Sequence, residues 1–214
     1  MIHSTVMALI FTSYILLFFS IHLYMDIQMV RSRRENREST KSHSDEFNIP
    51  LWAKILAFTP SFVFWGLFLV SPFLLYYKGY AWLSFVLWRS PHENAIQGIG
   101  LVMILVAILL ADWGRVSRGV IAPSAAMPDT YKISTRGAYN IMRHPMYVSY
   151  SLFFVGTPLA FLNLLLFGCV LGILGYYRIA QEEERVLTNR FGEEYIQYKK
   201  RVGMFIPRMR KKSQ

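Results

Sequence analysis

The chain has 214 residues, of which 54% are hydrophobic and only 17% are charged. Its mean hydropathy is +0.31, which lies outside the usual range of a soluble domain and indicates that the bilayer is the solvent. The formal net charge of +10 would suit nucleic acid, but the basic residues follow the loops between apolar stretches. We therefore expect no nucleic-acid partner.

The apolar stretches predict the fold class. A spanning helix needs about 20 apolar residues, and such stretches occur near residues 5–25, 51–77 and 96–113, with a closely spaced pair at 145–162 and 164–177. We predict an all-α integral membrane protein with about five transmembrane helices, the last two forming a tight antiparallel hairpin over 145–177. The first stretch is predicted to be a retained helix, because no basic segment precedes it and no small-residue cleavage site follows it.

Charge predicts the orientation of these helices. All but Lys54, Lys78 and Arg89 of the basic side chains lie in the segments after the first helix, after the third helix and after residue 177. By the positive-inside rule these segments are cytoplasmic, which leaves the N-terminus outside and the C-terminus in the cytoplasm. Residues 1–111 then form a three-helix membrane region with a cytoplasmic loop over 26–50. The basic part of that loop, residues 31–46, is predicted to be solvated and able to touch anionic lipid.

Two prolines and several glycines mark the helices. Pro60 and Pro72 predict a kink or a stop within the second helix, because proline removes a donor and clashes with the preceding turn. Glycines in the last two stretches allow close backbone approach and predict a tight hairpin between them, namely Gly156, Gly168, Gly172 and Gly175. One cysteine, Cys169, excludes a disulfide framework, and the five histidines lack zinc-ligand spacing, so no metal is expected.

The sequence "RHPMY" marks the start of the fourth helix. Proline favours the first helical position, so Pro145 should begin the helix with His144 at its cap. The helix N-terminus attracts a carboxylate or phosphate, and Arg143 and His144 would reinforce it. Alternatively, Arg143 anchors the helix at the headgroups and His144 only caps it. "RHP" by itself leaves both interpretations open.

The fifth apolar stretch is too short for a bilayer, because charges begin at Arg178 and continue in "QEEER". Either these charges line a polar cavity or they meet solvent at the helix exit. Arg178 and Glu182 stand four residues apart and are predicted to pair, while Glu183 points about 100° away and is free for another partner.

These residues carry a family resemblance. "TYKISTRGAYNIMRHPMYVSY" and "EEERVLTNRFGEEYIQYKKRVGMFIP" resemble the C-terminal half of the isoprenylcysteine carboxyl methyltransferase family, including its prokaryotic members and the related phospholipid methyltransferases. The resemblance implies a methyltransferase-like region over 112–214 with a cytoplasmic pocket for S-adenosylmethionine, which leaves as S-adenosylhomocysteine, and a cytoplasmic C-terminal helix. It implies cofactor contacts from Tyr131, Lys132, Ile133, Ser134, Tyr139, His144, Pro145, Met146, Tyr147 and Glu183. Family members often have histidine where this chain has Tyr131. Arg178 lies near the position of an arginine assigned to the methyl acceptor.

The resemblance implies a lipophilic acceptor that enters from the bilayer, a carboxylate of the prenylcysteine type in the first place. Methyl transfer needs alignment more than acid-base chemistry, and an amine acceptor would need a base for which no buried His/Asp pair is apparent in the sequence. A phospholipid amine or a small thiol remains an alternative acceptor. A sterol-reductase-like oxidoreductase that uses NADPH and a scaffold without turnover are the alternative functions.

Overall fold

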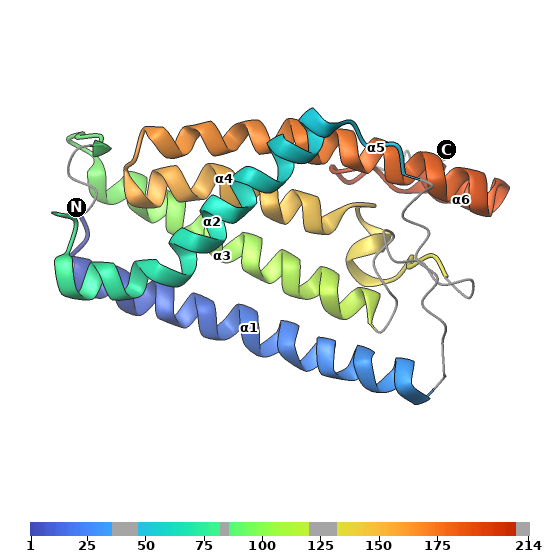
Figure 1. The fold of residues 1–214 in the computed structure, drawn as a ribbon, viewed down its shortest axis with the longest axis horizontal. Helices are drawn as coiled ribbons and strands as arrows, with labels where there is room; N and C mark the ends of the chain where they lie inside the picture. Colours follow the sequence, from blue (N-terminus) through green and yellow to red (C-terminus); the bar gives the residue numbers. More distant parts are fainter. Residues whose placement is uncertain (36–46, 82–85, 120–131, 209–214) are drawn as a thin grey trace, which may run out of the picture.

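The computed structural model describes residues 1–35, 47–81, 86–119 and 132–208, and these residues are almost entirely helical. Figure 1 shows long helices running side by side, with the N-terminus and α6 at opposite ends of the bundle. Within the described ranges three helices are long and apolar enough to cross a membrane, which indicates a membrane protein. The elements are α1 (Ser4–Glu35), α2 (Leu51–Lys78), α3 (Glu93–Arg118), η4 (Gly137–Asn140), α4 (Pro145–Phe161), η5 (Leu165–Leu171), α5 (Gly172–Phe191) and α6 (Glu193–Arg201).

The first three helices extend the predicted stretches. α1 continues to Glu35, so the segment expected to be a loop from residue 26 begins as helix, and the rest of the basic loop, from residue 36, lies outside the described residues. α2 runs through both Pro60 and Pro72 without ending. It lies obliquely across its neighbours and bends along its course (Figure 1), which is how a helix accommodates an internal proline.

α3 and α4 touch backbone to backbone. A methyl group built on Gly100 of α3 would lie 2.3 Å from the backbone nitrogen of Ala160 and 2.7 Å from the carbonyl oxygen of Gly156 on α4. Small residues bring helices this close because no side chain separates their axes. Gly156 therefore serves the α3–α4 contact rather than the predicted hairpin.

The glycines of α5 chiefly serve a contact with α2. A methyl group on Gly175 would lie 2.4 Å from the nitrogen of Ala57. On Gly172, it would lie 2.5 Å from the ring of Phe154 on α4 and 3.1 Å from the carbonyl oxygen of Leu56 on α2. A methyl group on Gly168 would meet nothing within 4 Å. The sequence argument that these glycines close the α4–α5 hairpin is thus correct only for Gly172, because spacing along one helix does not identify the partner.

The reversal after α4 is short. Leu162 ends the helix in the left-handed conformation at φ 50° and ψ 42°, and the side-chain oxygen of Asn163 accepts the backbone N–H groups of Leu165 and Leu166 at 2.9 and 3.3 Å. The chain continues as the 3-10 segment η5 before it becomes α-helical at Gly172. The predicted helix over 164–177 is therefore only partly α-helix. α4 has 17 residues and is not among the three candidate spans, so two spans there remain a prediction.

Aromatic rings fill the centre of the bundle. Phe64 of α2 stacks on Phe153 of α4 with centroids 4.3 Å apart, and Phe11 of α1 stacks on Phe161 of α4 at 5.0 Å. All four rings are buried. This packing holds α4 in place and so fixes where its N-terminal end, with the RHP sequence, lies.

A polar cluster joins α1 to α3, with buried side chains on α3 and a more exposed Asp26 on α1. His22 Nδ1 lies 3.1 Å from Asp112 Oδ1, and Arg115 Nη2 lies 2.6 Å from Asp26 Oδ1. The His/Asp pair was not apparent in the sequence, because His22 and Asp112 are far apart along the chain. Neither side chain lines the cavity described below, so the pair fixes how α1 and α3 pack and supplies no base there.

Candidate functional site

The fourth helix begins where the sequence predicts. Pro145 is its first residue and His144 precedes it at the cap. The His144 side chain makes no capping hydrogen bond to the helix. Its ring turns instead toward α5, with Nε2 3.2 Å from Glu184 Oε1 and Nδ1 3.6 Å from Glu183 Oε2. Of the two interpretations of "RHP", simple capping by the histidine side chain is therefore wrong.

A C-terminal strap, residues 202–206, lies against the start of α4. The backbone N–H groups of Arg143 and His144 donate to the carbonyls of Gly203 and Met204 at 2.9 and 3.1 Å. A methyl group on Gly203 would lie 1.8 Å from the carbonyl oxygen of Ile206, so the turn of the strap requires glycine there. The strap brings the C-terminal part of the described chain to the RHP sequence.

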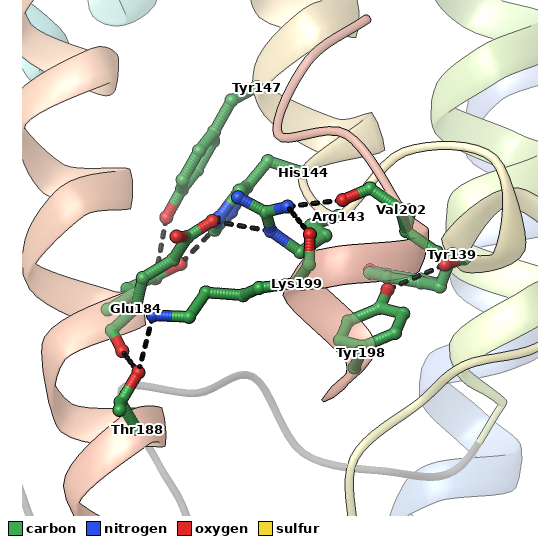
Figure 2. A network of polar contacts seen from close by, with 10 residues as sticks. Tyr139, Arg143, His144, Tyr147, Glu184, Thr188, Tyr198, Lys199 and Val202 are labelled. Atoms are coloured by element: carbon green, nitrogen blue, oxygen red, sulfur yellow. Dashed lines mark hydrogen bonds and ion pairs between the residues drawn. The ribbon is translucent and has the colours of Figure 1, made fainter. Parts of the chain in front are cut away.

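Arg143 holds the strap and α5 together. Figure 2 shows its guanidinium between Glu184 and the carbonyl of Val202. Nε donates to Glu184 Oε1 at 2.7 Å, and Nη1 donates to the carbonyls of Lys199, at 3.3 Å, and Val202. The side chain is 9% exposed. Arg143 is thus neither a headgroup anchor nor a group left open for an anion, and its role is to join three segments of the chain.

The segment before the RHP sequence docks on the end of α3. The Ser117 hydroxyl oxygen accepts a hydrogen bond from the backbone N–H of Ala138 at 3.0 Å. The Ser117 backbone carbonyl accepts one from the Ser134 hydroxyl at 3.3 Å. Gly137 adopts φ 54°, and a methyl group there would lie 2.2 Å from Ser117 Oγ. The short helix η4 follows and carries Tyr139, whose carbonyl accepts the Tyr198 hydroxyl at 2.6 Å (Figure 2). These contacts place Tyr139 beside the strap.

Two successive glutamates of α5 have different partners. Glu183 accepts the Tyr147 hydroxyl at 2.6 Å, while Glu184 takes the ion pair with Arg143. The preceding Glu182 faces elsewhere, where it accepts the Asn48 backbone N–H at 2.7 Å and pairs with Arg185 at 2.7 Å. The predicted ion pair between Glu182 and Arg178 is therefore wrong, because Glu182 forms its ion pair with Arg185 instead. The prediction that Glu183 has a different partner is correct.

These elements enclose a cavity of about 230 Å³. Eight residues expected as cofactor contacts line it: Ile133, Ser134, Tyr139, His144, Pro145, Met146, Tyr147 and Glu183. Lys132 is exposed and does not line it, and Tyr131 lies outside the described residues. Arg178 is half-buried on α5 and also lies outside the lining.

The cavity has further lining residues that the sequence reasoning did not select. They are Arg118 at the end of α3, Leu187 on α5, and Tyr195 and Tyr198 on α6, while Arg143, which the sequence analysis named as a possible anion-binding residue, lines the cavity as well. The "FGEEY" run supported the family resemblance, but only the docking of α6 shows that its tyrosine faces the cavity. Glu184, adjacent to the lining residue Glu183, was likewise not selected, although it stands within the same acidic run.

Burial and charge set the protonation of these groups. Burial raises the pKa of Glu184, but hydrogen bonds from His144 and Arg143 outweigh it and hold that pKa below its usual value. Burial raises the pKa of Tyr139, Tyr195 and Tyr198, so all three hydroxyls are neutral donors at neutral pH. The cavity therefore presents neutral phenols beside arginines, and the ionised Glu184 lies next to the lining residue Glu183.

The donor set suits a zwitterionic, partly aromatic ligand. A carboxylate has about four acceptor positions, and Tyr147 and His144 use one or two of those on Glu183, which leaves room for an ammonium or a ribose hydroxyl. Arg118 Nε is buried without a hydrogen-bond partner in the described structure, which suits a ligand carboxylate. Four tyrosine rings offer stacking surfaces for a base, and their faces attract a cation.

Comparisons with known proteins find methyltransferases. Residues 96–194 match the family model for phospholipid methyltransferase. The protein-S-isoprenylcysteine O-methyltransferase of Homo sapiens is 29% identical over 173 residues, which is 78% of this chain and 52% of that protein. Methanethiol S-methyltransferase 1 of Bradyrhizobium diazoefficiens is 42% identical over 82 residues, 38% of this chain and 28% of that protein. The isoprenylcysteine enzyme of Xenopus laevis is 32% identical over 140 residues, 59% of this chain and 48% of that protein.

The apolar helices and the matched model indicate a membrane protein similar to the phospholipid methyltransferases. Within that class, the curated relatives support a member of the isoprenylcysteine carboxyl methyltransferase family. The chain spans about half the length of the curated isoprenylcysteine methyltransferases that it matches.

Proposed function

We propose that this protein is a membrane-bound methyltransferase that uses S-adenosylmethionine and acts on a lipophilic acceptor, in the first place a carboxylate of the prenylcysteine type. The observation that carries the proposal is the convergence of His144, Tyr147 and Glu183 on one cavity, with the unpartnered Nε of Arg118 among its lining residues. When bound, S-adenosylmethionine would supply an electrophilic methyl group, to which an acceptor oxygen or sulfur would bond as the methyl–sulfonium bond breaks and S-adenosylhomocysteine leaves.

The residues of the cavity are suited to binding and orienting. Glu183 would hold an ammonium or ribose hydroxyl, and Arg118 would hold a carboxylate, because each offers a complementary charged hydrogen-bonding group. Tyr147 fixes one oxygen of Glu183 through a 2.6 Å hydrogen bond, and Arg143 and Glu184 fix the position of His144. Such preorganisation is the main requirement of a displacement that needs no general acid.

Arg178 remains the proposed contact for the acceptor carboxylate. Its support is its place on α5, beside the partly exposed Tyr177 and at the end of the apolar run, where a lipid headgroup and the protein meet. A carboxylate is ionised at neutral pH and needs no base. Arg178→Ala should therefore raise the KM for a carboxylate acceptor and leave S-adenosylhomocysteine affinity unchanged. A loss of S-adenosylhomocysteine affinity in this variant would refute the assignment.

A thiol acceptor is the second candidate, favoured by the 42% identity over 82 residues to a methanethiol S-methyltransferase. A thiol must lose its proton before it attacks, and His144 is the cavity group suited to accept one. The pH dependence of turnover distinguishes the two acceptors. A carboxylate acceptor predicts a flat rate above about pH 6, whereas a thiol acceptor predicts a rate that rises with pH through the neutral range.

The test of the cofactor is the unfolding temperature of the purified protein, titrated separately with S-adenosylhomocysteine and with NADPH. A ligand at a hundred times its Kd adds about 2.7 kcal/mol to the unfolding free energy. We expect a shift with S-adenosylhomocysteine alone, lost in Glu183→Gln. Glu182→Gln is the matched control, because it removes the neighbouring carboxylate outside the cavity and should keep the shift. A shift with NADPH alone would refute the proposal, and so would an unchanged shift in Glu183→Gln.

A further inference from the structure

A second cavity lies on the other side of the C-terminal strap. It has a volume of about 330 Å³ and shares only Tyr198 with the first cavity. Its polar lining comes from Arg201 at the end of α6, Arg208 beyond the strap, Thr135 before η4 and Asn140 at the end of η4. Among the described residues no acidic side chain lines it, so this lining is cationic.

The two guanidinium groups have spare hydrogen-bonding capacity. Arg208 Nη1 donates to the carbonyl of Lys200 at 2.6 Å, which holds its side chain across the end of α6. Arg201 has no hydrogen-bond or ion-pair partner within the described part of the chain. An anion between the two guanidinium groups would accept hydrogen bonds from their unused N–H donors and offset the repulsion between their charges. The planar fork of arginine matches a phosphate better than a monatomic ion.

The surroundings of this cavity suit a position at the level of lipid headgroups. Ile206 of the strap is 78% exposed, and Ile141, which lines the cavity, is 38% exposed. The ring of Phe205 lies 6.0 Å from that of Tyr177 on α5, and Tyr177 is itself exposed near the end of the apolar run. Exposed apolar side chains beside a tyrosine and arginines are typical of a membrane interface.

We propose that this second cavity binds the phosphate group of an anionic membrane lipid. Arg201 and Arg208 would take the phosphate oxygens, Asn140 and Thr135 would donate further hydrogen bonds, and Ile206 would enter the adjacent acyl region. This assignment is independent of the methyltransferase proposal, since it concerns a different cavity and needs no turnover. Free phosphate shares the same chemistry, so the experiment must separate the two sources.

The experiment measures the unfolding temperature of the detergent-purified full chain against three probes at matched ionic strength: short-chain phosphatidylglycerol, short-chain phosphatidylcholine and inorganic phosphate. We expect saturable stabilisation by phosphatidylglycerol and a much weaker effect of the other two. The double variant Arg201→Gln with Arg208→Gln should raise the apparent Kd for phosphatidylglycerol by at least about tenfold for each arginine–phosphate interaction that is lost. Lys54→Gln with Lys78→Gln is the control, because both are exposed cations outside this cavity, and its Kd should stay within about twofold.

A second variant separates lost recognition from lost folding. Arg201→Lys with Arg208→Lys keeps both charges but removes the forks, so it should bind phosphatidylglycerol with an affinity between those of the wild type and the glutamine variant. Equal affinity of the wild type and the glutamine variant would overturn the proposal, as would an equal loss in the control. An arginine-dependent response to inorganic phosphate, with no added effect of the lipid, would overturn the lipid source.

Discussion

The ion pair between Arg143 and Glu184 should stabilise the whole C-terminal end of the fold. Both side chains are nearly buried, at 9% and 13% exposed, with Nε and Oε1 2.7 Å apart. Removing one partner of a buried pair costs about 3–5 kcal/mol, because the other charge stays buried without its partner. Arg143→Met should therefore lower the unfolding temperature by about 6–20 °C, at about 2–4 °C for each kcal/mol in a chain of this size.

A double-mutant cycle separates the pair from its surroundings. Glu184→Leu leaves Arg143 with the carbonyls of Val202 and Lys199, so this variant should lose less stability than Arg143→Met. The double variant removes both charges and should be more stable than the sum of the single losses predicts, with a coupling energy of about 1–3 kcal/mol. The assay is thermal unfolding in one detergent followed by circular dichroism at a fixed scan rate. Additivity of the two losses within about 0.5 kcal/mol would refute the assigned role of the ion pair.

Three further predictions concern packing, pH and the strap. Gly100→Ala should cost about 1–3 kcal/mol, because its methyl group meets α4 backbone, whereas Gly98→Ala, with nothing within 4 Å, should be neutral or slightly stabilising; equal unfolding temperatures would contradict the close approach. The pKa of Glu184 is lower in the folded than in the unfolded protein, so its ionisation stabilises the fold above the unfolded pKa of about 4.3, and this stability is lost as the pH falls through the folded pKa. Acidification should therefore lower the unfolding temperature of the wild type more than that of Glu184→Gln. Parallel curves of unfolding temperature against pH would refute this role of Glu184. Gly203→Ala should release the strap and speed tryptic cleavage after Arg201, with Gly168→Ala as the unaffected control; unchanged cleavage would show that the turn tolerates a side chain.

The parts of the site that were predictable follow from local chemistry and from motifs. Pro145 begins its helix because the ring fixes φ and needs no hydrogen-bond donor, a rule that holds in any fold. The residues inferred from the family resemblance meet in one cavity, apart from Lys132, Arg178 and the undescribed Tyr131. The resemblance could place them because a motif records a whole three-dimensional arrangement, which composition and periodicity do not.

The parts that were not predictable depend on contacts between distant segments. From its spacing, Gly175 was predicted to pack against α4 in the hairpin, yet it packs against Ala57 of α2. A small residue permits close packing with any neighbouring helix, so its spacing does not identify which helix that is. Arg143 looks like an anion-binding residue, yet its donors go to Glu184 and to the strap. His22 and Asp112 meet only because α1 and α3 run side by side. In each case the partner lies in a distant segment of the chain, which spacing along one helix does not identify.

The C-terminal strap also has a consequence for biosynthesis. Arg143 and Val202 are 59 positions apart in the chain, so the ribosome makes the start of α4 well before the segment that closes on it. Until α5, α6 and the strap have followed, the Arg143 guanidinium and the backbone N–H groups beside it lack their final partners. A nascent chain stalled before residue 202 would thus contain α1 to α6 but lack the carbonyl groups of Val202, Gly203 and Met204 that accept hydrogen bonds from Arg143 and His144.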